Sequence, residues 1–530
     1  MPKEKTVFID LTKRNFNYFN NTLFSKVVND FLDEHQEVEI KDLIKNEDDL
    51  AKVYLEVLSN NKEHVKDPFL MYKTLEKIYD YWRNIKRYVL FDLKKGPFID
   101  KNNFLGQFDS LNEFLLGSYR TICTNLNGKT FTVFRQLPAF ANAFILLDRS
   151  KANPYPVFND ARFISRIAFR TPFISYSTSN KRTGVFPIIE QNPLDGLKID
   201  KKLFCFPILV GQDKINVYFT ERYMSLGLSL ANLFEHNNEY MNAKPDGIII
   251  FGSNTIDGIY YDKEKDLYIG SLVESDVIDY FGYLKKIILT VHNIKMIQNN
   301  KLPIHGAGVS ITIRDKTVKN VVLIGDSGAG KSETLEALRE IASDDIVDIL
   351  TIYDDMGTFE LNGKVSTYGT EIGAFVRTDD LAHDYVYKVF DRAIFLNPNG
   401  NNARLVLPVT AYQDVVKKYP VDLVLYANNY ELKDHKIKIY SDKNEALKIF
   451  KEGKRIALGT TSENGLVSTF FANPFGPVQL QEKTSMLLDK YFDNLYKNGV
   501  LVGELYTGLS LDKDNPKLAA KELLKLLKEN

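Results

Sequence analysis

Apolar and polar positions follow two different patterns along the first half of the chain. Over residues 43–88 apolar residues recur every three or four positions with charges between them, which predicts helices. The run Lys94-Lys95-Gly96-Pro97 breaks this pattern. Farther on, short runs such as 130–134 and 203–208 are typical of strands in an aromatic-rich setting.

A polar turn cluster at residues 242–247 precedes a new apolar run at 248–251, which predicts a strand after a boundary. We therefore expect three segments: a helical segment over 1–97, a mixed α/β domain over 98–245 and a third domain over 246–530. A chain of 530 residues is also longer than one hydrophobic core usually supports.

The second half alternates predicted helices and strands, as an α/β fold does. A long helical pattern spans 273–296, and a hairpin is expected about Asn362-Gly363 within 358–368. Further strands are predicted at 309–313, 321–324, 346–352, 404–409, 421–426 and 455–458, and a final amphipathic helix at 516–527.

Between the strand at 321–324 and a helix that starts near Ser332 lies a complete phosphate-binding loop. Its glycines allow backbone amides to approach phosphate oxygens at a helix N-terminus. Lys331 is expected to reach the β- and γ-phosphates, and the Ser332 hydroxyl to bind the magnesium of the nucleotide. The loop and the first helical turn consist of Gly325, Asp326, Ser327, Gly328, Ala329, Gly330, Lys331, Ser332 and Glu333. The sequence therefore predicts that the protein binds a nucleoside triphosphate.

Two adjacent acids, Asp354 and Asp355, follow the strand at 346–352. The carboxyl end of a strand is where ligands bind in open α/β sheets, so one acid is expected to hold a metal ion and the other to act on water or a hydroxyl. The alternative is a turn or helix-cap pair.

Bulk composition narrows the function classes. The chain has 68 Lys and Arg against 69 Asp and Glu, which argues against a nucleic-acid partner. Two cysteines without a CxxC pair, and an amino-terminal start without an apolar core, indicate a cytoplasmic protein without structural zinc. No apolar run approaches the roughly 20 residues that cross a bilayer.

His305 and Lys286 carry little information when taken alone. A single histidine is more often structural than a ligand, and a lysine on an amphipathic helix is usually a solvated charge. Lysine binds a metal only when it is neutral, with its pKa lowered by burial and by the metal. The residues by themselves thus predict a nucleotide and metal site with two acids.

The order of these motifs resembles the nucleotide-binding half of ATP-type phosphoenolpyruvate carboxykinase over about 200 residues. The resemblance rests on the stretch from Tyr280 to Lys286, on His305, on the phosphate loop, on Asp354-Asp355 and on residues 369–377. The interval of 19 residues between Lys286 and His305 is also that of the family.

This resemblance implies an enzyme that converts oxaloacetate and ATP to phosphoenolpyruvate, carbon dioxide and ADP. It implies a Mn²⁺ ion bound by Lys286, His305 and Asp355, besides the Mg²⁺ at Ser332. It places Arg377 and Arg404 near the transferred phosphoryl group and Arg455 near the adenine. It also implies a two-domain carboxykinase-like fold, with the phosphate loop on a mixed sheet of the C-terminal half and an α/β N-terminal half.

The sequence departs from that family in two places. Its loop, with Gly330-Lys331-Ser332, looks more like that of HPr kinase/phosphorylase, which also has His-Gly before the loop and Asp-Asp after it. The Thr-Gly-Arg-Ser-Pro substrate motif is missing, and Arg135 is the nearest candidate for its arginine.

Three hypotheses therefore stay open: a carboxykinase, a serine kinase acting on a protein or small molecule with Asp354 or Asp355 as base, and an inert nucleotide-binding relative. The sequence does not decide between ATP and GTP, and it leaves the oligomeric state open.

Overall fold

The computed structural model describes residues 5–11, 22–92, 104–128, 133, 140–179, 185–199, 201–341, 345–378, 391–398, 403–458 and 464–529. Two compact units make up the chain: Met1–Asp148 with Ile164–Phe173, and Arg149–Phe163 with Ile174–Asn530. The fold is mixed α/β, with 35% helix and 32% strand, so the α/β part of the predicted fold class is confirmed, whereas the carboxykinase-like arrangement stays a prediction. The expected division at residues 97 and 245 stays a prediction.

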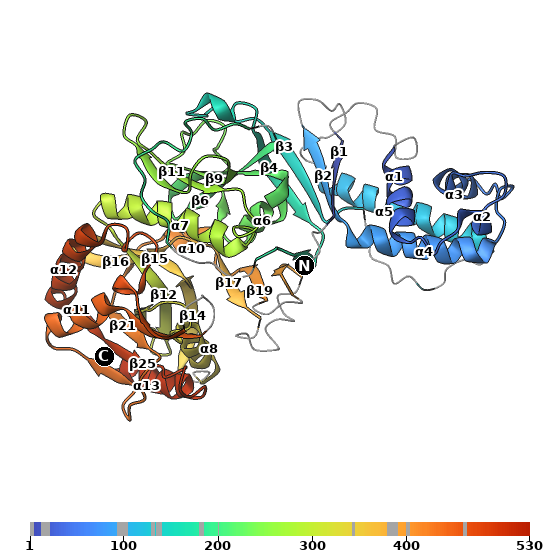
Figure 1. The fold of residues 1–530 in the computed structure, drawn as a ribbon. Coiled ribbons are helices and arrows are strands. Elements are labelled where there is room, and N and C mark those ends of the chain that lie inside the picture. The colour runs from blue at the N-terminus through green and yellow to red at the C-terminus, as the bar shows by residue number, and fades with distance from the viewer. Residues whose placement is uncertain are drawn as a thin grey trace. The chain divides into compact units, whose positions relative to one another are not determined.

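In the first unit three parallel strands pair in the order β1 (Thr6–Asp10), β2 (Lys86–Asp92) and β3 (Ala143–Asp148). Apolar residues of these strands form one core with the helices, among which α4 and α5 run side by side (Figure 1). The helices are α1 (Thr22–Glu34), α2 (Ile40–Leu43), α3 (Leu50–Leu58), α4 (Pro68–Asn84) and α5 (Phe104–Asn127).

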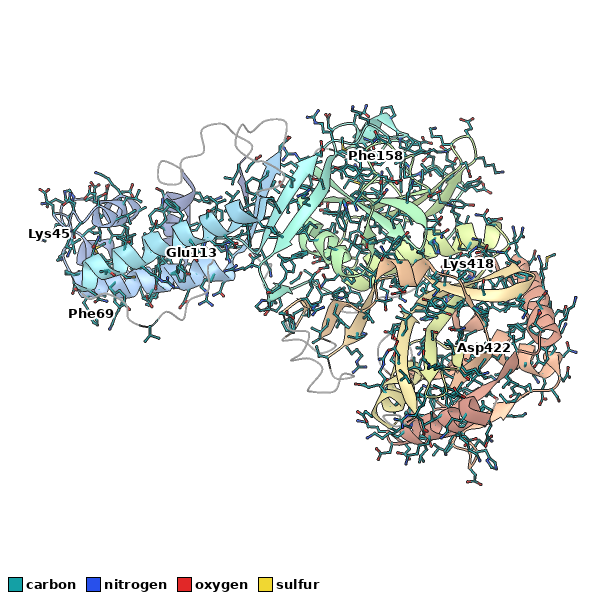
Figure 2. All side chains as sticks on the ribbon, turned by 180° about the vertical axis from the view of Figure 1, so that it is seen from behind. Lys45, Phe69, Glu113, Phe158, Lys418 and Asp422 are labelled. Carbon is teal, nitrogen blue, oxygen red and sulfur yellow. The ribbon has the colours of Figure 1, made fainter. Side chains whose placement is uncertain are left out.

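Helix α4 shows how local sequence sets an element. Its N-cap residue Asp67 accepts hydrogen bonds from the amides of Phe69 and Leu70, and Pro68 fits the first turn because it needs no donor. Phe69 is exposed at this end of the helix, and Glu113 lies on α5 (Figure 2).

Two sequence expectations for this unit need correction. The helical pattern was extended to Tyr88, yet β2 begins at Lys86, because buried β-branched and aromatic residues there pair with β1 and β3. The long helix α5 was not predicted at all. The expected break at 94–97 lies outside the described residues, as does the run at 130–134 apart from Val133, which is in neither a helix nor a strand.

In the second unit, the strands of one sheet pair in the order β6-β7-β9-β11-β10, with β8 beside β6. Its core includes Phe158 (Figure 2). The Phe158 ring stacks on that of Tyr218, with the ring centroids 3.9 Å apart. The strands are β6 (Leu203–Val210), β7 (Asp213–Thr220), β8 (Glu235–His236), β9 (Gly247–Ser253), β10 (Gly258–Asp262) and β11 (Leu267–Val273), and helix α6 (Met224–Ser229) follows β7. Two more strands, β4 (Arg162–Phe169) and β5 (Phe173–Ser175), contain residues of both units.

The second sheet of this unit carries the phosphate loop. Its order is β20-β16-β15-β12-β13-β21-β25-β22, with β14 also paired to β12, and β13, β21 and β25 are parallel. The strands are β12 (Leu302–Ile313), β13 (Val318–Ile324), β14 (Ile346–Tyr353), β15 (Met356–Asn362), β16 (Lys364–Gly369), β20 (Tyr419–Pro420), β21 (Leu423–Asn428), β22 (Ile437–Ile439) and β25 (Leu501–Tyr506).

Helices cover both faces of this sheet (Figure 1). Alternate residues of β13 point to opposite faces, so Val322 and Ile324 pack with α11 (Lys443–Glu452) and α12 (Gln481–Lys497). Val321 and Leu323 pack with α8 (Lys331–Ile341) and α13 (Asn515–Glu529) on the other face. Burial on both faces explains why the run 321–324 is continuously apolar.

Most predicted elements of the second half are confirmed, including β9, β13, β14, the β15–β16 hairpin and α13. The helix expected from Val273 is wrong at its start, because Val273 ends β11 and α7 begins at Phe281. His305 lies within β12, not before it.

Helix α7 (Phe281–Gln298) is buried on nearly all sides and contacts β9, β11 and β12. A helix buried on nearly all sides is an interior helix, so two of its three lysines, Lys285 and Lys286, are held largely in the interior. Smaller elements complete the unit: β17 (Gly373–Arg377), β18 (Ile394–Leu396), β19 (Arg404–Pro408), α10 (Tyr412–Val416), β23 (Lys454–Leu458) and β24 (Asn464–Ser468).

No helix in the described ranges is long and apolar enough to cross a membrane. The two cysteines, Cys123 and Cys205, are both buried and free.

Candidate functional site

The phosphate loop joins β13 to α8, as the sequence predicts. Gly328 and Gly330 have φ of +78° and +88°, a backbone region that residues with a Cβ rarely adopt. A Cβ on Gly330 would also press on Thr507. These two glycines therefore set the turn between β13 and α8, and the N-terminus of a helix after such a turn is a typical anion-binding site.

Lys331 and Ser332 occupy the end of this loop. The Lys331 ammonium is buried and donates hydrogen bonds to the carbonyls of Gly325, at 2.7 Å, and Asp326, at 3.1 Å. The exposed Ser332 hydroxyl donates to Oδ1 of Asp354 at 3.2 Å. Serine and aspartate thus lie together where a nucleotide-bound magnesium is expected.

Asp326 and Arg455 form a buried ion pair beneath the loop. The Arg455 Nε donates to Oδ2 of Asp326 at 2.8 Å, and the Asp326 Oδ1 accepts from the amide of Ser327. Burial raises the pKa of Asp326, but His305 and Arg455 outweigh it and hold the pKa below its usual value. Arg455 is thus placed to support the loop, and its predicted role beside adenine stays a prediction. The side chain of Glu333, in the first turn of α8, is half-buried.

A second group of side chains converges on Asp355. The Lys286 Nζ lies 2.5 Å from Oδ2 of Asp355, and the His305 Nε2 lies 2.9 Å from Oδ1. Lys286 comes from α7, His305 from β12 and Asp355 from the turn after β14. The structure therefore brings together the three residues that the resemblance names as metal ligands.

The tautomer of His305 follows from its second hydrogen bond. Its Nδ1 lies 2.8 Å from the carbonyl oxygen of Ala472, which can only accept, so Nδ1 carries a proton. In the neutral ring the Nε2 lone pair then faces the Asp355 carboxylate at 2.9 Å. Two acceptors at this distance need a proton or a cation between them.

The charges of these groups depend on burial and on one another. Burial lowers the pKa of His305, although Asp355 acts in the opposite direction. Burial and the neighbouring Lys285 charge lower the pKa of Lys286, against the effect of Asp355. The pKa of Asp355 lies well below its usual value because Lys285, Lys286 and His305 outweigh its burial. Metal binding by these residues requires an ionised acid, a neutral imidazole and a neutral amine, and the lowered pKa values of His305 and Lys286 shift both groups in that direction.

Lys285, the neighbour of Lys286, is the most buried cation of the site. Its Nζ lies 2.7 Å from Oδ2 of Asp355 and 2.8 Å from Oε1 of Glu371. Despite burial, these two acids raise the pKa of Lys285, so it stays charged. Burial raises the pKa of Glu371. The sequence does not indicate that Lys285 and Glu371 form a buried ion pair, because a second lysine on a helix or a glutamate after a strand is not a specific signal.

The segment 469–476 covers the same group. Phe471 and Ala472 have positive φ of 54° and 49° and are fully buried, so the backbone is strained where it presents the Ala472 carbonyl to His305. The Phe475 ring lies 4.6 Å from the Lys286 Nζ and 6.0 Å from the His305 ring. This segment fixes the orientation of two candidate ligands, and no motif in the sequence indicates it.

Gly453 supports the strained turn, and its replacement by alanine is expected to destabilise the fold. Gly453 has φ +55°, and an added Cβ would overlap the Thr469 carbonyl and press on the Ala472 amide. Gly499 has φ +71° but open space around it. Gly453→Ala should therefore lower the free energy of unfolding by about 1–3 kcal/mol more than Gly499→Ala does. Urea unfolding followed by circular dichroism measures the difference, and equal losses would contradict this account of the turn.

Among the described residues, no group of three or more His, Cys, Asp or Glu side chains that could hold a metal ion occurs. The Lys286, His305 and Asp355 set contains only one imidazole and one acid, so a metal here depends on the amine. Ligand atoms on one first-row metal ion lie about 3 Å apart, given bonds of roughly 2.0–2.2 Å. The His305–Asp355 separation of 2.9 Å is close to this value, whereas the 2.5 Å contact of Lys286 with Asp355 is a direct hydrogen bond that the lysine would have to give up to bind a metal.

The remaining candidate arginines face each other on neighbouring strands. Arg377 on β17 and Arg404 on β19 are paired in the antiparallel register. The Arg404 guanidinium lies over the Phe375 ring at 5.2 Å, and the Lys285 ammonium lies over the same ring at 5.8 Å. Arg135, the weak candidate for a substrate arginine, lies outside the described residues.

Comparison with known proteins adds no name to this geometry. No protein-family model matches the chain, and a search of curated proteins found no match.

Proposed function

We propose that the protein is a metal-dependent phosphotransferase of the carboxykinase type, which converts oxaloacetate and ATP to phosphoenolpyruvate, carbon dioxide and ADP. The observation that carries the proposal is the convergence of Lys286, His305 and Asp355 in the same unit as a complete phosphate loop. The two-domain carboxykinase-like arrangement of the fold is part of this proposal.

The residues divide the reaction between them. Lys331 and the loop amides would hold the β- and γ-phosphates, and Ser332 with Asp354 would bind the nucleotide's Mg²⁺. A Mn²⁺ ion held by Lys286, His305 and Asp355 would supply Lewis-acid chemistry at the keto acid. Arg377 and Arg404 would stabilise the charge of the transferring phosphoryl group. The route needs no general base.

A hydroxyl-directed kinase is the second candidate, and one observation favours it. Burial and the neighbouring Asp355 charge raise the pKa of Asp354, which brings this acid closer to the range of a general base. The phosphate loop, which looks like that of HPr kinase, points in the same direction. In that mechanism Lys286 has no direct role.

The test measures ADP release by the purified chain with ATP, Mg²⁺ and Mn²⁺. One assay supplies oxaloacetate, and a parallel assay supplies free serine and serine-containing peptides. The proposal expects turnover that requires oxaloacetate and yields phosphoenolpyruvate. Turnover that ignores oxaloacetate but follows a hydroxyl acceptor would overturn it in favour of the kinase. Nucleotide binding without turnover in either assay would indicate an inert relative, with GTP tested in the same way.

A further inference from the structure

Phe375 is the one aromatic ring that two cations of the described site share. Lys285 Nζ lies 5.8 Å and Arg404 Cζ 5.2 Å from its centroid, both within the range of a cation–π interaction. Two rings at the start of α7, Tyr280 and Phe281, lie against it at 6.1 and 5.2 Å. Phe375 therefore links α7, which carries the candidate metal ligand Lys286, to the strand that carries Arg404.

The two cations that share this ring differ in their partners. Lys285 is neutralised by Asp355 and Glu371. No carboxylate within the described ranges pairs with Arg404, and its buried Nε has no hydrogen-bond partner. Buried donors in proteins are normally hydrogen-bonded. The Arg404 guanidinium has an unsatisfied buried N–H and contacts a ring face, so it can bind an anionic ligand.

We propose that Phe375 is a positioning residue, which holds Arg404 in place for the anionic group of a substrate. The inference rests on the proposed function, because it makes Arg404 part of the phosphoryl-transfer site. The ring quadrupole attracts both cations, so the Arg404 guanidinium stays ordered against the ring without an acid partner. The group bound is a compact anion, a phosphoryl or a carboxylate.

A double-mutant cycle tests this role. The variants are Phe375→Leu, Phe375→Tyr, Arg404→Gln and the double variant Phe375→Leu/Arg404→Gln, each as the full chain saturated with ADP and Mn²⁺. Calorimetry measures the dissociation constants of inorganic phosphate and of malonate, which distinguish a phosphoryl from a carboxylate subsite. The dissociation constants of ADP and Mn²⁺ report whether each variant keeps its fold.

Phe375→Leu is expected to weaken binding of one of the two anions about three- to tenfold, with little change for ADP and Mn²⁺. Phe375→Tyr, which keeps the ring, should stay within about twofold of the natural protein. In the Arg404→Gln variant, adding Phe375→Leu should not weaken anion binding further, because the ring acts through the arginine.

Unchanged anion binding in Phe375→Leu would overturn the proposal. It would also be overturned if Phe375→Leu weakened anion binding equally in the natural protein and in the Arg404→Gln variant. Absence of phosphate and malonate binding to the natural protein at millimolar concentration would also overturn it. If Phe375→Leu weakens anion binding only when Arg404 is present, but oxaloacetate gives no turnover, the proposed reaction is wrong and the positioning role of Phe375 is retained.

Discussion

Replacing Lys286 with methionine is expected to lower manganese-dependent turnover by a factor of about 10³ or more. Methionine keeps most of the side-chain length but has no nitrogen to bind a metal. The loss should appear both in the rate and in the affinity for Mn²⁺, which should fall at least about 10- to 100-fold. Steady-state rates across a Mn²⁺ titration, with electron paramagnetic resonance of free Mn²⁺, measure both quantities.

Lys497→Met is the matched control, because Lys497 is exposed at the end of α12. It should keep the rate and the Mn²⁺ affinity of the natural protein. If Lys286→Met keeps full activity, Lys286 is no ligand. If it loses activity while Mn²⁺ affinity is unchanged, Lys286 contributes through its charge alone.

Lys331→Ala is expected to reduce phosphoryl transfer by about 10²–10³, whichever acceptor the protein uses. Its ammonium is held by the carbonyls of Gly325 and Asp326, so it lies at the loop that receives the phosphates. Loss of this charge should weaken stabilisation of the transferring group more than binding of the nucleotide base. Single-turnover rates with ATP, beside ATP and ADP dissociation constants, separate the two effects.

The control for this prediction is Lys521→Ala on α13, whose side chain is exposed. Its rate should match that of the natural protein. A Lys331→Ala variant that transfers phosphate at an undiminished rate would contradict the assignment of the loop.

The loop and its sheet could be predicted because their signals are local. Four apolar residues before Gly325, glycines at fixed positions and a helical pattern after Ser332 together determine strand, turn and helix. The Asn362-Gly363 hairpin is local in the same sense, and Gly363 does have a positive φ of 78°.

The partners of the candidate metal site could not be predicted, because they come from distant parts of the chain. The carbonyl that orients His305 belongs to Ala472, and the second acid that pairs with Lys285, beside Asp355, is Glu371. Every residue has a backbone carbonyl, so the residue type does not indicate which carbonyl accepts a hydrogen bond. The sequence also misplaces the start of α7, because the apolar strand β11 ends at Val273 and apolar residues recur between it and Phe281, where the helix begins.

The resemblance to a known family added the pairing of Lys286 with His305, which the residues alone do not suggest. The structure brings these side chains to one carboxylate, and that geometry does not identify the acceptor. The acceptor depends on residues that the sequence places only loosely, such as Arg135.

The proposed function depends on a divalent ion bound by Lys286, His305 and Asp355. Anomalous scattering from crystals of the full chain grown with Mn²⁺ and ATP tests it most directly, because the signal locates manganese independently of the protein chemistry. We expect a peak about 2.0–2.3 Å from the Lys286 Nζ, the His305 Nε2 and an Asp355 oxygen, besides any peak at Ser332. Manganese found only at Ser332 and Asp354, with Lys286 still paired as an ammonium to Asp355, would contradict it.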